Sequence, residues 1–266
     1  MEYKNYTALK IKVNQGVAFV TIDNGEINLM NLPLLTDLQR FYTDVLTDDE
    51  VRVIVLQSAN PDFFIAHYDV SMINTPQNLK SWKEYLWSYR ENSKITVAKI
   101  EGRIGGGGNE FTLFFDMRFG AIDKAIFHQA EAMIGIIAGG GGVVLGRKKL
   151  GRARALETQL GCYSYSALLA EKYGWINRAI PADEIGPFVE KLAYRMAMIP
   201  PETVKIIKKT MNATEELPLM EALIKESVLF GEAANLEESK RRMSIFVNSG
   251  GQSKESEMGS EEDIQK

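Results

Sequence analysis

The amino-acid sequence predicts an α/β fold in which a largely parallel sheet is followed by a helical region. In the first half of the 266 residues, apolar runs rich in β-branched side chains alternate with stretches of helical periodicity, which is the pattern of an α/β core. After about residue 160, helical signals follow one another with few strand-like runs between them. The composition, 45% hydrophobic and 25% charged, is typical of a globular protein with a sizeable core.

Four runs of apolar and β-branched side chains are typical of strands, and they cover residues 8–13, 17–22, 51–58 and 95–100. Between them, Leu34, Leu38 and Phe41 recur at helical spacing and predict a helix over 34–45. A second helix is predicted over 81–93. Strand and helix therefore alternate through the first half of the chain.

Helices predicted after residue 160 cover about 164–174, 183–199, 202–213 and 218–247. Ser164 is a candidate N-cap of the first, Pro200-Pro201 ends the second, and Gly231 is a candidate break in the last. Gly, Ser and Glu dominate after residue 248 and predict disorder there. The expected organisation is an α/β core at 1–160, a helical region at 161–248 and a disordered tail at 249–266.

Charge and sorting signals exclude several classes of protein. The net charge is −4 and the one basic run is Lys240-Arg241-Arg242, so a general nucleic-acid-binding face is not expected. Residues 1–10 lack the apolar segment of a secretory signal, and no run of about 18 apolar residues predicts a membrane span. The single cysteine, Cys162, cannot form an internal disulfide. We therefore expect a cytoplasmic protein.

A glycine-rich turn stands between a predicted strand and a predicted helix. Four glycines, residues 105–108, are followed by Asn109 and Glu110. Such a turn frees backbone N–H groups at a helix start, where they can hold negative charge. The turn lacks the Lys-Ser/Thr ending of a P-loop, and residue 110 is Glu where a dinucleotide fingerprint needs Gly. A purely structural turn is an equally good interpretation of the four glycines alone.

Two glutamates are candidates for acid–base chemistry. Glu110, at a helix start, can also be a simple partner of the helix dipole, and Glu131 can be a surface acid. Taken singly, each is more often structural. Glu131 nevertheless stands among mainly apolar residues, 125–135, where a charge needs a compensating interaction.

Five segments follow one another along the chain: 64–70 (Phe-Ile-Ala-His-Tyr-Asp-Val), 102–110, 116–118 (Asp-Met-Arg), 127–131 (Phe-His-Gln-Ala-Glu) and 135–142 (Gly-Ile-Ile-Ala-Gly-Gly-Gly-Gly). In this order they resemble the motifs of the crotonase superfamily, also called the enoyl-CoA hydratase/isomerase family. Residues 150–155 and 166–181 are similar to two further family segments, so the resemblance covers roughly 10–247. It implies the crotonase fold, a spiral of repeated strand–strand–helix units closed by a helical C-terminal region.

The resemblance also implies a reaction. Its substrate would be an acyl-coenzyme A thioester, or one on an acyl-carrier protein, with coenzyme A as part of the substrate and no separate cofactor or metal. Glu110 would activate water for attack at C3 of the enoyl chain, and Glu131 would deliver a proton to C2. The backbone amides of Tyr68 and Gly107 would form an oxyanion hole for the thioester oxygen.

Further contacts with the substrate and its coenzyme A are implied for Ile27, Ala66, His67, Asp69 and Gly106. Family members usually form trimers or hexamers through the C-terminal region, and we expect the same here. The sequence departs from the family pattern where His67 replaces a glycine, Tyr68 replaces a small residue, and Ala130 and Ala138 replace prolines. Because His67 and Tyr68 stand in the implied oxyanion loop, the acyl group is left open.

Four functions remain after this reasoning. Hydration of a 2-enoyl thioester, or the reverse dehydration, is favoured because both Glu110 and Glu131 are present. Isomerisation of the double bond needs only one acid and can also use two. Dehydration or decarboxylation of a polyketide-type thioester is a third candidate. A non-catalytic acyl-CoA-binding protein is the fourth, suggested by the altered loop at His67.

Overall fold

The chain forms two compact units in a computed structural model that describes residues 1–73 and 76–258, with the backbone alone for 76–81. The units are Met1–Ile199 and Pro200–Lys266. The α/β part therefore extends beyond the boundary expected near residue 160. The reason is strand pairing, because β9 (Ser164–Ser166) pairs with β8 (Ile126–His128) and β10 (Arg178–Ile180) pairs with β7 (Met117–Ala121).

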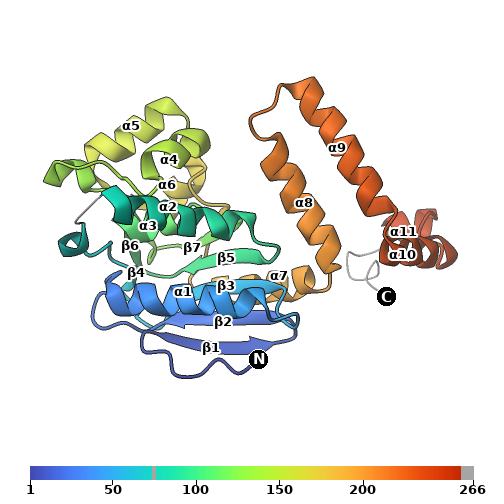
Figure 1. The fold of residues 1–266 in the computed structure, drawn as a ribbon, viewed down its shortest axis with the longest axis horizontal. Coiled ribbons are helices and arrows are strands. Elements are labelled where there is room, and N and C mark those ends of the chain that lie inside the picture. The colour runs from blue at the N-terminus through green and yellow to red at the C-terminus, as the bar shows by residue number, and fades with distance from the viewer. Residues whose placement is uncertain (74–75, 259–266) are drawn as a thin grey trace. The chain divides into compact units, whose positions relative to one another are not determined.

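The first unit contains two sheets (Figure 1). The larger has the order β1 (Leu9–Asn14), β2 (Val17–Ile22), β3 (Val53–Ser58), β5 (Ile95–Ile100), β7 and β10. Only β1 runs antiparallel in it, against β2. The smaller sheet has the order β4 (Phe63–Ile65), β6 (Arg103–Gly105), β8 and β9, and β9 is its antiparallel strand. The predicted parallel character of the main sheet is confirmed.

Successive turns of the chain repeat one unit. Each turn places a strand in the larger sheet, then a strand in the smaller sheet, then a helix. The three turns are β3, β4 and α2 (Pro76–Glu91); β5, β6 and α3 (Gly106–Thr112); and β7, β8 and α4 (Gly142–Leu150). This is the strand–strand–helix spiral that the sequence motifs implied. It brings the starts of α3 and α4 to the region beside the smaller sheet.

Local sequence accounts for the first helix and for the two faces of the larger sheet. Helix α1 (Leu32–Leu46) begins at Asn31, whose side chain accepts a hydrogen bond from the Leu34 amide at 3.3 Å. Its buried face packs into the core together with alternate strand residues such as Val20. The residues between them, such as Phe19, point to the opposite face, where helix α7 (Ile185–Ala197) packs.

Helices α5 (Arg152–Gly161) and α6 (Ala167–Tyr173) lie between α4 and α7 in the first unit. The N-cap of α6 is Ser166, whose hydroxyl accepts from the Leu169 amide at 3.3 Å. The prediction that Ser164 caps this helix was wrong, because Ser164 lies in β9 opposite His128. Gly174, in the left-handed conformation, ends the helix as predicted.

The second unit consists of α8 (Pro201–Thr214), α9 (Leu219–Ala234), α10 (Glu237–Asn248) and the short α11 (Lys254–Met258). The long helix expected over 218–247 is two helices, and the break is not at Gly231. It lies at Asn235, whose side chain donates to the Gly231 carbonyl at 2.8 Å, and at Leu236, which is extended. Disorder was expected from 249 on, but Lys254–Met258 is helical, and residues 259–266 lie outside the described part.

None of the helices in residues 1–73 and 76–258 combines the length and apolar character that crossing a membrane requires.

Candidate active site

The four-glycine turn connects β6 to α3 and is packed tightly against the loop that follows β4. Gly106 has a φ of 46°, which is unfavourable for residues with a side chain. A Cβ atom on Gly107 would lie only 2.6 Å from Cβ of Tyr68. Glycine is therefore required at both positions, by conformation at Gly106 and by space at Gly107.

The loop after β4 turns one backbone amide toward this glycine turn. The Met30 amide donates to the His67 carbonyl at 2.9 Å, and the Asp69 amide donates to the Met30 carbonyl at 3.1 Å. The His67 carbonyl and the Tyr68 amide belong to one trans peptide group, in which C=O and N–H point in opposite directions. Because that carbonyl faces Met30, the Tyr68 amide points away from Met30. Its nitrogen lies 3.4 Å from the position of a Cβ on Gly107.

The amides of Tyr68 and Gly107 thus lie close together. Within the described residues, neither amide has a hydrogen-bond acceptor. The Gly107 amide belongs to the first turn of α3, where N–H groups have no partner within the helix. The arrangement provides two adjacent backbone donors at the end of a helix that favours negative charge.

Glu110 follows one turn later in α3, and its side chain is 4% exposed. Its Oε1 atom accepts a hydrogen bond from the Gly142 amide at 2.8 Å. Burial raises the pKa of Glu110 to about 7, the Gly142 hydrogen bond offsets part of that rise, and the charge of Glu131 adds to it. The carboxyl group is therefore able to exchange a proton near neutral pH.

Glu131 begins the short 3-10 helix Glu131–Ile134, directly after β8. Its Oε1 accepts from the Gln129 side-chain Nε2 at 2.9 Å, and the side-chain oxygen of Gln129, Oε1, accepts from Nδ2 of Asn109 at 2.7 Å. The other oxygen, Oε2, is buried and has no hydrogen-bond partner in the described part of the chain. One oxygen is held in place and the other is left available.

The two carboxyl groups lie near the starts of α3 and α4. A Cβ atom on Gly142 would lie 3.0 Å from Oε1 of Glu110 and 3.3 Å from the Gln129 amide nitrogen that binds Glu131. A Cβ on Gly106 would lie 3.0 Å from Oε1 of Glu131. Glycines of both runs therefore let the two carboxyl groups approach the backbone closely. Such a pair of acids beside two free amides can move protons next to a bound carbonyl.

The remaining residues expected at the site lie along its loop. The Ile27 carbonyl accepts from the Ala66 amide at 3.1 Å, and a Cβ on Gly106 would lie 3.1 Å from Cβ of His67. The His67 side chain is exposed, with Nδ1 2.9 Å from the Tyr68 carbonyl. The Asp69 carboxylate accepts from Ser71 and caps the short 3-10 helix Val70–Met72.

Sequence reasoning gave no role to Gln129, Asn109 or Trp82. Asn109 and Gln129 lie inside the segments 102–110 and 127–131, which resemble family motifs. The position of Gln129 two residues before Glu131 was the one available signal that its side chain could contact that carboxylate. Trp82 lies in α2 and belongs to no motif. Its Nε1 atom lies 3.2 Å from the position of a Cβ on Gly140, and Oε2 of Glu110 lies 3.0 Å from the same position.

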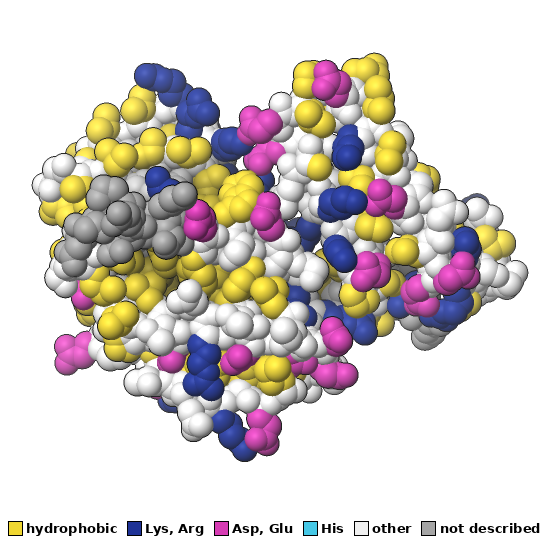
Figure 2. All heavy atoms as spheres, viewed as in Figure 1, with side chains coloured by type: hydrophobic (Ala, Val, Ile, Leu, Met, Phe, Trp, Pro, Cys, Tyr) yellow, Lys and Arg dark blue, Asp and Glu magenta, His cyan; other side chains and the backbone are white. Residues whose placement is uncertain are grey.

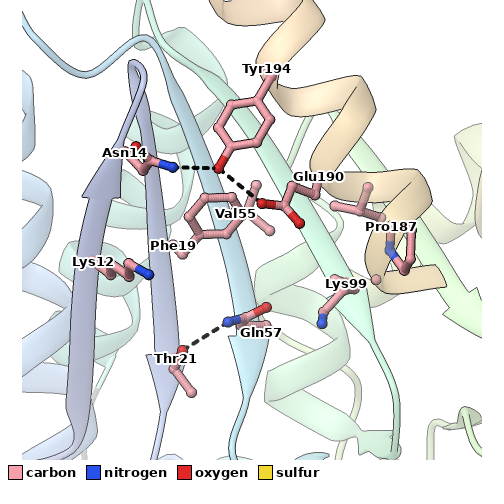
Figure 3. A pocket seen from close by; sticks show the side chains of 12 residues that line it. Lys12, Asn14, Phe19, Thr21, Val55, Gln57, Lys99, Pro187, Glu190 and Tyr194 are labelled. Carbon is pink, nitrogen blue, oxygen red and sulfur yellow. Dashed lines mark hydrogen bonds between the residues drawn. The ribbon is translucent and has the colours of Figure 1, made fainter. Parts of the chain in front are cut away.

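A hollow of about 490 Å³ lies on the other face of the larger sheet, beneath α7 (Figure 3). Its polar lining includes Lys12 and Lys99, and its one carboxyl group is Glu190, which accepts from the Tyr194 hydroxyl at 3.0 Å. No pair of acids lines it. The acid pair and the free amides therefore identify the start of α3 as the candidate active site.

Comparison with known proteins shows the family of the chain. Residues 12–254 match the family model described as enoyl-CoA hydratase/isomerase. A short-chain-enoyl-CoA hydratase of Clostridium acetobutylicum is 25% identical over 238 residues, 87% of this chain and 91% of that protein. A protein of Dictyostelium discoideum named as a probable mitochondrial enoyl-CoA hydratase is 30% identical over 252 residues, 92% of this chain and 90% of that protein. The solved structure of an enoyl-CoA hydratase from Geobacillus kaustophilus has a TM-score of 0.85 at 24% identity, over 93% of this chain and 96% of that one.

Proposed function

We propose that this chain, which belongs to the enoyl-CoA hydratase/isomerase family, adds water to a 2-enoyl thioester or removes it from a 3-hydroxyacyl thioester. The observation that carries the proposal is the pair Glu110 and Glu131, whose carboxyl groups lie against Gly142 and Gly106, near the free amides of Tyr68 and Gly107. Water chemistry at C2 and C3 of a thioester needs such a combination of two acid–base groups and two donors.

The Tyr68 and Gly107 amides are proposed to bind the thioester oxygen. Attack at C3 moves electron density onto that oxygen, and donors fixed in advance stabilise it without reorganisation. One such donor typically lowers the activation barrier by ~2.7–4 kcal/mol. The dipole of α3, a short helix, adds to the effect at Gly107.

The two carboxyl groups are proposed to divide the proton transfers. In hydration, Glu110 accepts a proton from water as the C3–O bond forms, and Glu131 donates its proton as the C2–H bond forms. A proton then returns from Glu110 to Glu131, so one water is consumed and no net proton is released. The raised pKa of Glu110, caused mainly by burial, makes it a stronger base than an ordinary carboxylate when ionised.

Binding of the rest of the substrate is proposed along the loop that holds Tyr68. Ile27, Ala66, Asp69 and Gly106 are its backbone neighbours, and the exposed His67 stands at the outer side. The proposed substrate is a coenzyme A thioester. Besides water, the proposed reaction uses no group other than this chain and its substrate, and a cytoplasmic location stays a prediction from the sequence.

The test is turnover of crotonyl-CoA and longer 2-enoyl-CoAs, followed as loss of the conjugated-thioester absorbance. Wild type is expected to hydrate members of the series, and Glu110→Gln and Glu131→Gln are each expected to lower kcat by about 10²–10⁴-fold. Glu26→Gln, on an exposed residue outside the site, is the matched control. Equal rates for wild type and both site variants would refute the assignment.

The same experiment separates the other functions. Turnover of 3-enoyl-CoA with no hydration of 2-enoyl-CoA would indicate an isomerase. Activity with an acyl-carrier-protein thioester alone would indicate the polyketide-type reaction. Binding of acyl-CoA without turnover of any of these substrates would indicate the non-catalytic protein.

We also propose that copies of the chain associate through the second unit, as a trimer or hexamer. Helix α9 exposes a set of large apolar side chains that include Leu219 at 77%, Ile224 at 60% and Phe230 at 72%, and hydrophobic side chains are visible on this unit in Figure 2. Contiguous exposed apolar surface is typical of an interface. Sedimentation should give the mass of an oligomer for wild type, a smaller species for Phe230→Glu, and no change for Lys225→Glu on the same helix. A wild-type monomer would refute it.

A further inference from the structure

Two aromatic side chains stand beside the candidate active site without a role in the proposed chemistry. The ring of Tyr68 and the indole of Trp82 lie 5.6 Å apart between centroids, with 53° between their planes. Both side chains are half-buried, so part of each ring surface remains available. We call the two side chains the aromatic wall.

The aromatic wall extends from the free amides to the carboxyl group of Glu110. At one end, Cβ of Tyr68 lies 2.6 Å from the position of a Cβ on Gly107, so its side chain leaves the backbone beside both donors. At the other end, Nε1 of Trp82 and Oε2 of Glu110 lie 3.2 and 3.0 Å from one position, that of a Cβ on Gly140. The indole edge and the carboxyl group are therefore neighbours.

A buried set of rings behind it supports the aromatic wall. Trp82 packs on Tyr85 at 5.6 Å between centroids, and the hydroxyls of Tyr85 and Tyr89 are 2.9 Å apart. Tyr89 is 2% exposed and stacks on Phe115 with 12° between the ring planes. Because such an interior is close-packed, the aromatic wall cannot collapse toward the core, and it presents a fixed surface to a ligand.

We propose that the substrate carries a planar aryl group on C3 and that Trp82 selects for it; this rests on the proposed function. With the carbonyl oxygen at the two amides and C3 beside Glu110, the substituent on C3 is the next group to meet the aromatic wall. Aromatic rings gain from offset or edge contacts with other rings beyond simple burial. A flexible alkyl chain gains burial alone and loses conformational freedom when it is held.

The reaction remains the water chemistry of the proposed function. For a 3-aryl substrate, the C3–O bond breaks and the C2–H bond breaks in dehydration, one water leaves, and the new double bond is conjugated with the ring. Conjugation favours the enoyl product, so dehydration is the direction to assay.

The experiment compares 3-hydroxy-3-phenylpropanoyl-CoA with 3-hydroxybutanoyl-CoA for wild type, Trp82→Leu and Trp82→Phe. The measured quantity is the ratio of kcat/KM for the phenyl substrate to kcat/KM for the butanoyl substrate. We expect this ratio to fall about tenfold in Trp82→Leu and less than about threefold in Trp82→Phe, which keeps a ring. Trp87→Leu, on the exposed side of the same helix, is the matched control and should leave the ratio unchanged.

Two results would overturn this inference and leave the proposed function intact. One is wild-type turnover of 3-hydroxybutanoyl-CoA with none of the phenyl substrate. The other is an unchanged ratio in Trp82→Leu, with a far-ultraviolet circular dichroism spectrum that matches wild type. If wild type dehydrates neither substrate and hydrates no 2-enoyl-CoA, the proposed function itself fails.

Discussion

Replacing Glu110 with glutamine is expected to stabilise the first unit at neutral and higher pH. The pKa of this carboxyl group rises from 4.5 to about 7, mainly because the group is buried. The Gly142 hydrogen bond lowers the pKa and the charge of Glu131 raises it, and both effects are included in that value. At about 1.36 kcal/mol for each pH unit between the two values, holding the ionised group in the fold costs roughly 3 kcal/mol. Glutamine has nearly the same shape, and its carbonyl oxygen can still accept from Gly142.

The pH range follows from the direction of the change in pKa. Because the pKa is higher in the folded state, the folded protein holds this proton more tightly than the unfolded chain does. Its contribution to stability is fully present below about pH 4.5 and is lost as the pH rises through about 7. The variant has no such loss. The gain of Glu110→Gln over wild type should therefore grow between pH 5 and pH 8, by roughly 2 to 3 kcal/mol.

Urea unfolding followed by tryptophan fluorescence measures this gain. The three tryptophans, Trp82, Trp87 and Trp175, all lie in the first unit, so the signal reports the unit that contains Glu110. Glu26→Gln, which removes an exposed carboxylate, is the control. A difference in unfolding free energy between Glu110→Gln and wild type that stays constant from pH 5 to pH 8 would refute the reasoning.

Three further predictions concern catalysis and folding. Both directions need the acid pair to hold one proton in all, on Glu131 for hydration and on Glu110 for dehydration. Above about pH 7, the pKa to which burial raises Glu110, the pair loses this proton, so kcat/KM should fall in both directions. Rate profiles from pH 5 to 9 test this, and opposite slopes for hydration and dehydration would contradict it. Gly107→Ala places a methyl group 2.6 Å from Cβ of Tyr68 and should lower kcat/KM by roughly 10²-fold or more. Gly186→Ala is the control, because a Cβ there meets no atom within 4 Å, and it should leave kcat/KM unchanged. Comparable values of kcat/KM in both variants would contradict the tight packing. Asn31→Ala removes the N-cap of α1 and should reduce the unfolding free energy by about 1 kcal/mol, measured by urea unfolding; an unchanged midpoint would show that the cap is not needed.

Elements with strong local patterns were predicted well. The strands at 17–22 and 95–100 have the predicted bounds, and α1 extends the predicted helix by two residues at its start and one at its end. Their side-chain periodicity repeats over several residues and does not depend on distant partners. The second half was predicted less well. The strands β9 and β10 are three residues each, and their existence depends on pairing with β8 and β7.

The candidate site divides in the same way. Glu110, Glu131 and the glycine turn could be selected from the sequence, since the motifs that contain them follow one another in a recognisable order. Their burial and the pKa of Glu110 could not, because both depend on residues from other turns of the spiral. Gly142, 32 residues after Glu110, supplies the hydrogen bond to its carboxylate.

The sequence by itself determined the class of fold and the family and selected two candidate acids, because these follow from periodicity and from residues that stand close together in the chain. Only the tertiary structure decided what surrounds the acids: the Gln129 amide on Glu131, the Gly142 amide on Glu110, and the indole of Trp82 beside it. The physical reason is that each of these contacts depends on how β8, α4 and α2 pack around α3. Packing of that kind is a property of the whole spiral and leaves no local pattern in the sequence.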